Sequence, residues 1–278
     1  MNTPDVTTSR SDSTSRSGIP LSAAYDLEQV SFAVAGRELL RAIDLRFNAG
    51  LVTGLVGHNG SGKTSLIKLL ARIHRPTSGS ITFGERPLAD WPHRTFAQQV
   101  AHLPQYTPAT DGLLVRELVA LGRYPWHGAL GRFSAEDRDR VNDAMHVTDV
   151  MRYADRAVDS LSGGERQRVW VAMLIAQGSR CLLLDEPTSA LDVGHQLEIL
   201  GLIRKLADER GVTAIVVLHD INMAARFCNE LVALRGGQVL MKSSPDAVMR
   251  PDCLRSIYGV PMGVFRKPDS GDVIGFPK

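Results

Sequence analysis

The sequence is poor in features that define several large classes of proteins. Only three cysteines occur among 278 residues, far apart and without CxxC spacing (Cys181, Cys228 and Cys253). Such an odd, scattered set is typical of buried or incidental thiols in a reducing compartment. Charge of one sign is also lacking, because 32 basic and 30 acidic residues are interspersed and leave a formal net charge of +2. Without a basic stripe, no nucleic-acid partner is expected.

Long hydrophobic runs are missing too. No stretch approaches the ~20 apolar residues that span a bilayer, and the longest runs, such as 214–218, have the length of a strand. Residues 1–18 are rich in Ser and Thr and have no apolar core of the signal-peptide kind. We therefore predict a disordered leader over 1–24 and a cytoplasmic protein whose membrane role depends on a partner.

Strand-like and helical patterns alternate along most of the chain, which predicts an α/β fold with a mainly parallel sheet covered on both faces. The stretch from about 90 to 160 differs, because charged helical segments replace the strands and predict a helical lobe. The helix predicted over 193–210 is amphipathic and has Val193, Leu197, Leu200 and Ile203 on one apolar face. The remaining expected elements are strands at 27–34, 39–47, 51–56, 180–184 and 213–218, helices at 63–73 and 135–147, a glycine hairpin at 236–237 and a last short helix after Ser244-Pro245.

A glycine-rich segment between a predicted strand and a predicted helix matches the pattern GxxxxGK[ST]. Its glycines allow backbone N–H groups to turn toward a phosphate, and the following helix N-terminus favours an anion. Lys63 would bring a compact positive charge to the β- and γ-phosphates, and the Thr64 hydroxyl is a hard ligand for Mg²⁺. A glycine turn without a nucleotide is the alternative, which the flanking elements disfavour. The segment comprises Gly57, His58, Asn59, Gly60, Ser61, Gly62, Lys63 and Thr64.

Two carboxylates end the apolar strand predicted at 180–184. Asp185 is expected to hold Mg²⁺ beside the phosphate loop. The next residue, Glu186, points the other way along the strand and is expected to orient or deprotonate the attacking water. An Asp-Glu pair alone often only solvates a loop, so this interpretation depends on Lys63.

A third motif, LSGGERQR at 161–168, precedes the acidic strand by about a dozen residues and opens a predicted helix. Alone it could be an ordinary capped helix start. Together with the phosphate loop, LLLDEPTSALD at 182–192 and Leu-His-Asp at 218–220, it resembles the ATP-binding-cassette (ABC) ATPases over about residues 27–259. This resemblance implies a P-loop NTPase core, an antiparallel β subdomain and an inserted helical subdomain at about 90–165, all within 25–265, followed by a tail at 266–278.

The resemblance also implies roles for individual residues. Gln105 is similar to the glutamine that contacts Mg²⁺ and water and hinges the helical lobe. His219 is similar to the histidine that faces the γ-phosphate, and the other seven histidines are expected to be surface or core residues. The segment Ser162, Gly163, Gly164 and Glu165 would clamp the γ-phosphate of ATP held by a second copy, and Asp192 would link the two sites. A soluble cassette protein of DNA repair or translation would usually carry a coiled-coil insertion or a second cassette, and this sequence shows neither. A purely structural nucleotide-binding module would be expected to lose Glu186 or His219, and both are present.

The adenine contact departs from the family pattern. These ATPases usually stack an aromatic residue on the base, from the first hairpin about twenty residues before the phosphate loop. The equivalent stretch here, 34–37, reads Val-Ala-Gly-Arg and has no aromatic. Either Val34 or Arg37 covers the base, or the contact is weak.

Longer strings narrow the resemblance further. Residues 54–63, 122–133 and 219–226 resemble the ATPases of bacterial iron(III)-hydroxamate siderophore importers. This implies a dimer that sandwiches two ATP with Mg²⁺, bound to a membrane permease at the cytoplasmic face of the inner membrane. A periplasmic or lipoprotein substrate-binding protein would be an indirect partner. Import of another iron chelate, haem or cobalamin is the alternative within transport, and a soluble non-transport ABC ATPase is the alternative outside it.

Overall fold

A six-stranded sheet lies at the centre of the computed structural model, which describes residues 24–129, 131–189, 191–268 and 271–278. Its strand order is β10-β9-β3-β8-β7-β6, with β10 antiparallel to β9 and the other neighbours parallel. The strands are β3 (Val52–Val56), β6 (Val100–Leu103), β7 (Cys181–Leu184), β8 (Thr213–Val217), β9 (Glu230–Arg235) and β10 (Gln238–Ser243). The predicted leader falls almost wholly outside the described residues.

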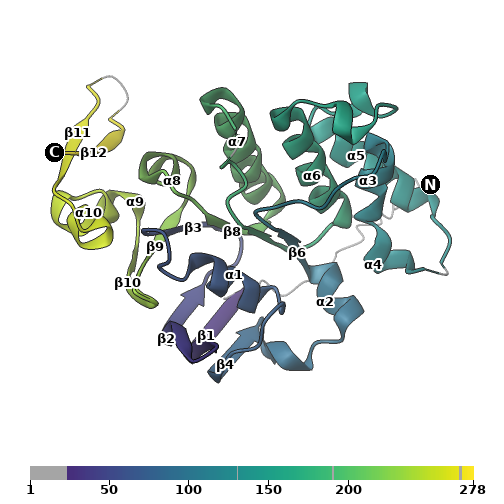
Figure 1. Ribbon diagram of the computed structural model, residues 1–278. Coiled ribbons are helices and arrows are strands. Elements are labelled where there is room, and N and C mark those ends of the chain that lie inside the picture. The colour runs from purple at the N-terminus through teal and green to yellow at the C-terminus, as the bar shows by residue number, and fades with distance from the viewer. Residues whose placement is uncertain (1–23, 130, 190, 269–270) are drawn as a thin grey trace, which may run out of the picture.

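Helices cover both faces of this sheet (Figure 1). The helices are α1 (Lys63–Leu70), α2 (His93–Gln99), α3 (Val115–Leu121), α4 (Tyr124–His127), α5 (Ala135–Val147), α6 (Gly163–Gln177), α7 (Val193–Arg210), α8 (Ile221–Phe227), α9 (Pro245–Val248) and α10 (Pro251–Tyr258). Three 3₁₀ turns join them, η1 (Leu88–Asp90), η2 (Met151–Tyr153) and η3 (Val158–Ser160). Figure 1 shows α6, α7 and α8 on one side of the sheet and α1 and α2 on the other, as the predicted α/β class requires.

The apolar strands divide their side chains between two cores because neighbouring residues of a strand face opposite sides. In β7, Leu182 and Leu184 join the core beneath α6 and α7, whereas Cys181 and Leu183 join the core around α1. All four are at most 3% exposed. Burial on both faces explains why this segment is a continuous apolar run rather than an alternating one.

A second, antiparallel sheet packs on the far side of α1 (Figure 1). Its order is β2-β1-β4-β5, from β1 (Tyr25–Val34), β2 (Arg37–Phe47), β4 (Ser78–Phe83) and β5 (Arg86–Pro87). The hydroxyl of Tyr25 donates to the carbonyl of Leu70 at the end of α1, 3.0 Å away. The sheet, which the family resemblance implied, thereby fixes α1 and the loop that leads into it.

The helical lobe is held together by a buried ion pair. Arg123 Nε donates to Asp137 Oδ1 at 2.8 Å, and the two side chains are 5% and 7% exposed. Burial raises the pKa of Asp137, but hydrogen bonds from Ser134 and Arg123 outweigh that effect and bring the pKa to about 2. Arg123 also donates to the carbonyl of Ala176 and lies over the ring of Trp126. The pair therefore joins the loop before α4 to α5 and to the end of α6.

Several sequence expectations differ from the structure. The helix expected to reach residue 73 ends at Leu70, and Arg72 adopts a left-handed φ of 59°. The stretch expected to be helical also contains β6, the edge strand of the central sheet. Val193 is not buried but 63% exposed, because the buried face of α7 begins only at Ile199. The helix after Ser244-Pro245 is α9, and α10 follows it.

The stretch predicted as a tail contains strand β12 (Val273–Pro277), which pairs antiparallel with β11 (Met262–Arg266). The Asn222 side chain fastens this hairpin to α8. Its Nδ2 donates to the carbonyl of Gly275 at 3.1 Å, and its Oδ1 accepts from the N–H of Gly275 at 2.8 Å. Across the described residues, no helix is long and apolar enough to cross a bilayer.

Candidate active site

A pocket of about 540 Å³ opens between the phosphate loop and the residues that follow β6, β7 and β8. Parallel strands end at one edge of a sheet, where α/β proteins usually bind ligands. Loop residues, three polar side chains from the strand ends and two residues of β2 line the pocket: Arg37, Leu39, Asn59, Gly60, Ser61, Gly62, Lys63, Thr64, Ser65, Gln105, Glu186 and His219. Residues distant in sequence thus share one cavity.

The phosphate loop adopts a backbone that most residues could not. Gly62, the N-cap of α1, has φ 105°, and an added Cβ would lie 2.6 Å from Leu40 Cδ2. The Lys63 ammonium donates to the carbonyls of Gly57 and His58 at 2.8 and 3.0 Å, inside the loop. The hydroxyl of Ser61 is buried and has no hydrogen-bond partner. A loop with an unpaired donor, a lysine and a helix N-terminus fits a polyphosphate.

Lys63 is only 5% exposed, and burial lowers its pKa, while Glu186 and Asp185 act in the opposite direction. An arriving anion would add to the groups that favour the charged ammonium.

Thr64 and Asp185 bring hard oxygens together beside the loop. The Thr64 hydroxyl donates to Asp185 Oδ1 at 3.1 Å, and Asp185 is 2% exposed. Burial raises the pKa of Asp185, against the hydrogen bond from Thr64. A divalent cation here would favour the ionised carboxylate. No cluster of three His, Cys, Asp or Glu residues in the described part of the chain could hold a metal alone. The Thr64 hydroxyl and the Asp185 carboxylate are hard oxygen donors of the kind that Mg²⁺ would use together with waters and phosphate oxygens.

Glu186 lies between two polar partners from neighbouring strand ends. Its Oε1 is 2.6 Å from His219 Nε2, and its Oε2 accepts from Gln105 Nε2 at 2.6 Å. Its backbone is left-handed, with φ 54°, although it is not glycine. Such a conformation costs about 1–3 kcal/mol and persists only where surrounding structure enforces it. The three side chains contact one another and line the same pocket as the phosphate loop.

The LSGG segment lies outside this pocket, because none of Ser162 to Glu165 lines it. Ser162 caps α6: its hydroxyl accepts from the N–H of Glu165 at 3.3 Å, and Glu165 Oε2 accepts from the N–H of Ser162 at 2.9 Å. Hydrogen bonds from Tyr153 and then Ser162 lower the pKa of Glu165 to about 2. This reciprocal cap fixes the first turn of α6 and keeps Glu165 ionised.

Asp192 also lies outside the pocket lining and caps α7. Its Oδ1 accepts from the N–H of His195 at 2.9 Å, and its Oδ2 is 2.8 Å from His195 Nδ1. The backbone N–H of His195, followed by its ring, lowers the pKa of Asp192. The carboxylate therefore holds both the backbone and the side chain of the same residue.

Residues 40–189 match the protein-family model described as ABC transporter. The chain belongs to the ABC transporter family. ATP hydrolysis is the activity of this family, so the chain is an ATP-hydrolysing enzyme. The predicted family and fold are thereby confirmed.

Relatives of this ABC chain extend over most of its length. It is 39% identical to "Iron(3+)-hydroxamate import ATP-binding protein FhuC" of Bacillus subtilis, covering 87% of this chain and 90% of that protein. It is 34% identical to "Ferric enterobactin transport ATP-binding protein FepC" of Escherichia coli, covering 90% and 92%. It is 39% identical to "Hemin import ATP-binding protein HmuV" of Pseudomonas fluorescens, covering 88% and 96%.

Solved structures agree with the ABC fold. A metal-chelate type ABC transporter in an inward-facing conformation superposes with a TM-score of 0.81 at 24% identity, covering 92% of this chain and 98% of that chain. The dimeric cassette MJ0796 superposes with a TM-score of 0.69 at 27% identity, covering 80% and 98%.

The sequence alone left open whether Val34 or Arg37 contacts the adenine base. Arg37 lines the pocket, together with Leu39, whereas Val34 does not and is 50% exposed. Leu39 and Ser65 were not predicted, because neither belongs to a motif. His195 was expected to be a surface or core residue, and its bond to Asp192 was missed. Its position three residues after an N-cap aspartate was the available signal.

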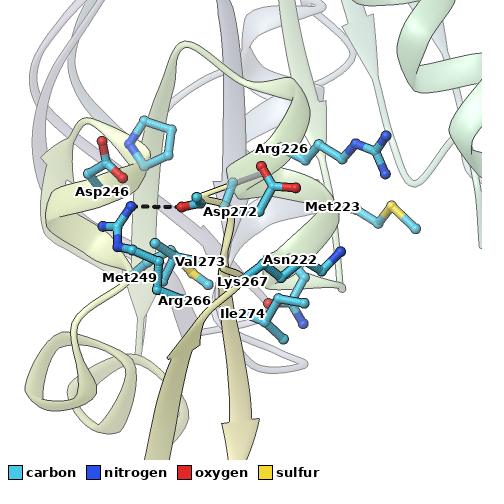
Figure 2. Close-up of a pocket in the computed structure, with 13 residues that line it drawn as sticks. Asn222, Met223, Arg226, Asp246, Met249, Arg266, Lys267, Asp272, Val273 and Ile274 are labelled. Carbon is cyan, nitrogen blue, oxygen red and sulfur yellow. Dashed lines mark hydrogen bonds between the residues drawn. The ribbon is translucent and has the colours of Figure 1, made fainter. Parts of the chain in front are cut away.

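A second pocket, of about 360 Å³, lies between α8, α9 and the β11–β12 hairpin (Figure 2). Figure 2 shows Met223 and Arg226 of α8 on one side and the hairpin beside them, where Arg266 Nη1 donates to the carbonyl of Gly271 at 2.7 Å. The two pockets share no residue. The second one borders α8, the helix that follows His219.

Proposed function

We propose that this chain is the ATP-hydrolysing subunit of an importer that takes up iron(III)-hydroxamate siderophores across the cytoplasmic membrane. The observation that carries the hydrolytic part is the meeting of Lys63, Glu186 and His219 in one pocket at the carboxyl edge of a parallel sheet. The transport part is supported by relatives named as import or transport ATP-binding proteins, which match over 84% or more of this chain.

Residues 57–64 would bind the phosphates of ATP. Backbone N–H groups of the loop and the start of α1 face the anion, and Lys63 neutralises charge at the β- and γ-phosphates. Thr64, Asp185 and Gln105 would hold Mg²⁺, which when bound neutralises phosphate charge. Because Thr64 and Asp185 already touch, little rearrangement would be needed to present both oxygens.

Glu186 would accept the proton of the attacking water, or orient that water, at the γ-phosphate. Gln105 and His219 hold its two carboxylate oxygens at 2.6 Å each, so neither oxygen is free to rotate away. His219 would in addition face the γ-phosphate. We infer that the carboxylate releases one partner when water enters.

A second copy would complete each ATP site. Ser162 to Glu165 and Asp192 lie outside the chain's own pocket, so they are available to the nucleotide of another copy. The free N–H groups at the start of α6 would face that γ-phosphate. The superposition with a cassette described as dimeric supports this arrangement.

The helical lobe offers a surface for a membrane permease. Tyr124, Trp126 and Phe133 are 54%, 39% and 40% exposed, although such side chains are usually buried. The Arg123–Asp137 ion pair holds their loop in place. Docking there would keep the chain peripheral, at the cytoplasmic face of the inner membrane, with a substrate-binding protein as an indirect partner.

The division of the chain into an ATP-binding domain at 25–265 and a C-terminal tail at 266–278 stays a prediction.

Deletion of the gene is expected to abolish growth with a hydroxamate siderophore as the sole iron source. The wild-type allele should restore growth, and a Glu186→Gln allele should not. Growth on unrelated nutrients is the control. Unimpaired siderophore-dependent growth of a deletion strain that has no second such ATPase would contradict the proposed substrate. If that strain instead fails to grow with haem as the sole iron source, the result would support haem import, the alternative that the 39% identical hemin-import relative suggests.

The ATP pocket also predicts the adenine contact. Arg37→Ala is expected to weaken ATP binding about two- to fivefold, because a guanidinium stacked on a base contributes roughly 0.5–1 kcal/mol. Binding of inorganic tripolyphosphate, which has no base, should not change. Titration calorimetry with both ligands makes the comparison.

Arg41→Ala provides the control for Arg37, since Arg41 lies on the same strand, pairs with Glu38 at 3.5 Å and is not part of the pocket. An equal loss for both ligands would mean that Arg37 contacts phosphate, and no loss for ATP would exclude the base contact.

A further inference from the structure

The first turns of α6 and α7 meet at a single glycine. Gly164 is the second residue of α6, and a Cβ added to it would lie 2.2 Å from Cδ2 and 2.6 Å from Nε2 of His195. Any side chain at 164 would therefore displace the imidazole. The ring rests against the backbone of the LSGG segment, which only glycine permits.

The same imidazole is bound to the loop before α7. Its Nδ1 lies 2.8 Å from Oδ2 of Asp192, and that carboxylate oxygen can only accept, so Nδ1 is the donor. The N–H of His195 donates to the other oxygen at 2.9 Å. His195 is 34% exposed and Asp192 70% exposed at their side chains, so this bond lies at the surface.

A second contact joins α6 and α7 one turn further along both helices. Arg168 of α6 forms an ion pair with Glu198 of α7, and Arg168 also approaches Asp149 at 3.8 Å. His195 and Glu198 are three residues apart and face the same side of α7. The two helices, which run side by side in Figure 1, are thus in contact at successive turns.

We propose that His195 is a positioning residue that sets the loop at Asp192 relative to the Ser162–Glu165 segment. This rests on the proposed function, in which both segments face the nucleotide held by a second copy. One imidazole touches both segments within one chain, so it fixes their spacing before the copies meet. Its hydrogen bond to Asp192 carries this role, and Gly164 makes room for it.

His195→Ala should lower kcat for ATP hydrolysis by at least ~10-fold, because misplacing a binding group by about 1 Å can cost up to 100-fold. Monomer affinity for ATP and Tm should stay at wild-type values, since His195, Asp192 and Gly164 all lie outside the lining of the chain's own pocket. His195→Asn should recover most of kcat, because its amide N–H can donate to Asp192. His195→Phe keeps a ring but no donor and should not recover it.

Steady-state phosphate release from the purified full-length chain measures kcat, and titration with ATP and thermal unfolding measure affinity and Tm. The matched control is His146→Ala, at an exposed histidine on α5. Turnover of His195→Ala within twofold of wild type overturns the inference. So does a loss that follows a lower Tm or weaker monomer binding, or a failure of His195→Asn to recover kcat. A wild-type chain without ATPase activity would instead overturn the proposed function, and this inference with it.

Discussion

Replacing Glu186 by glutamine is expected to slow ATP hydrolysis at least ~100-fold while MgATP still binds, because the loss of a general base has about that effect. Glutamine has nearly the shape of glutamate, and its amide oxygen can still accept from Gln105, whose Nε2 lies 2.6 Å from the carboxylate. The phosphate loop is untouched. ATP should therefore stay bound, and dimers should accumulate.

Single-turnover phosphate release measures the chemical step of Glu186→Gln, and light scattering with and without ATP measures the dimer. Glu136→Gln serves as control, since that carboxylate is 71% exposed on α5 and is not part of the pocket lining. Near-normal turnover would remove Glu186 from the role of base. Slow turnover without an ATP-dependent dimer would instead count against the sandwich of two copies.

Replacing Lys63 by alanine is expected to weaken ATP binding about 10- to 100-fold and to reduce hydrolysis with it. A hydrogen bond to a charged group contributes about 1.5–3 kcal/mol, which corresponds to that range. Lys63 is also the one lysine or arginine in residues 57–64. The carbonyls of Gly57 and His58 would lose their donor as well, which adds strain within the loop.

Comparison with His219→Ala separates binding from chemistry. His219 contacts Glu186 and none of the loop carbonyls, so its loss should reduce turnover and leave affinity nearly unchanged. Lys205→Ala, at a side chain 63% exposed on α7, controls for loss of a positive charge. Equilibrium titration with a fluorescent ATP analogue makes the test. Unchanged affinity in the Lys63 variant would contradict the phosphate site.

Much of the site could be predicted because its chemistry is local. The phosphate loop and the acidic strand end each lie within about eight consecutive residues, and their spacing to a strand and a helix is enough to orient them. The same applies to strands such as β7, whose burial on both faces makes them uniformly apolar. Local periodicity also predicted α5 and α7 with their observed bounds.

The remaining features depend on how distant segments pack, and sequence pattern carries no such information. Arg37 enters the pocket only because β2 passes over the phosphate loop, where Leu40 lies against Gly62. His195 was missed because its contact with Gly164 joins two helices. Val193 was placed on the buried face because it has the right period, but the first turn of α7 lies beyond the apolar core.

The left-handed backbone of Glu186 lowers the stability of the fold at a position where hydrolysis requires a carboxylate. With φ at 54°, this position would suit glycine, and a glutamate there holds the native state at a higher free energy by about 1–3 kcal/mol. A chain selected only for thermal resistance would therefore tend to lose its carboxylate at 186. Retaining it limits how stable an active form of this fold can become, and that limit arises from one backbone angle.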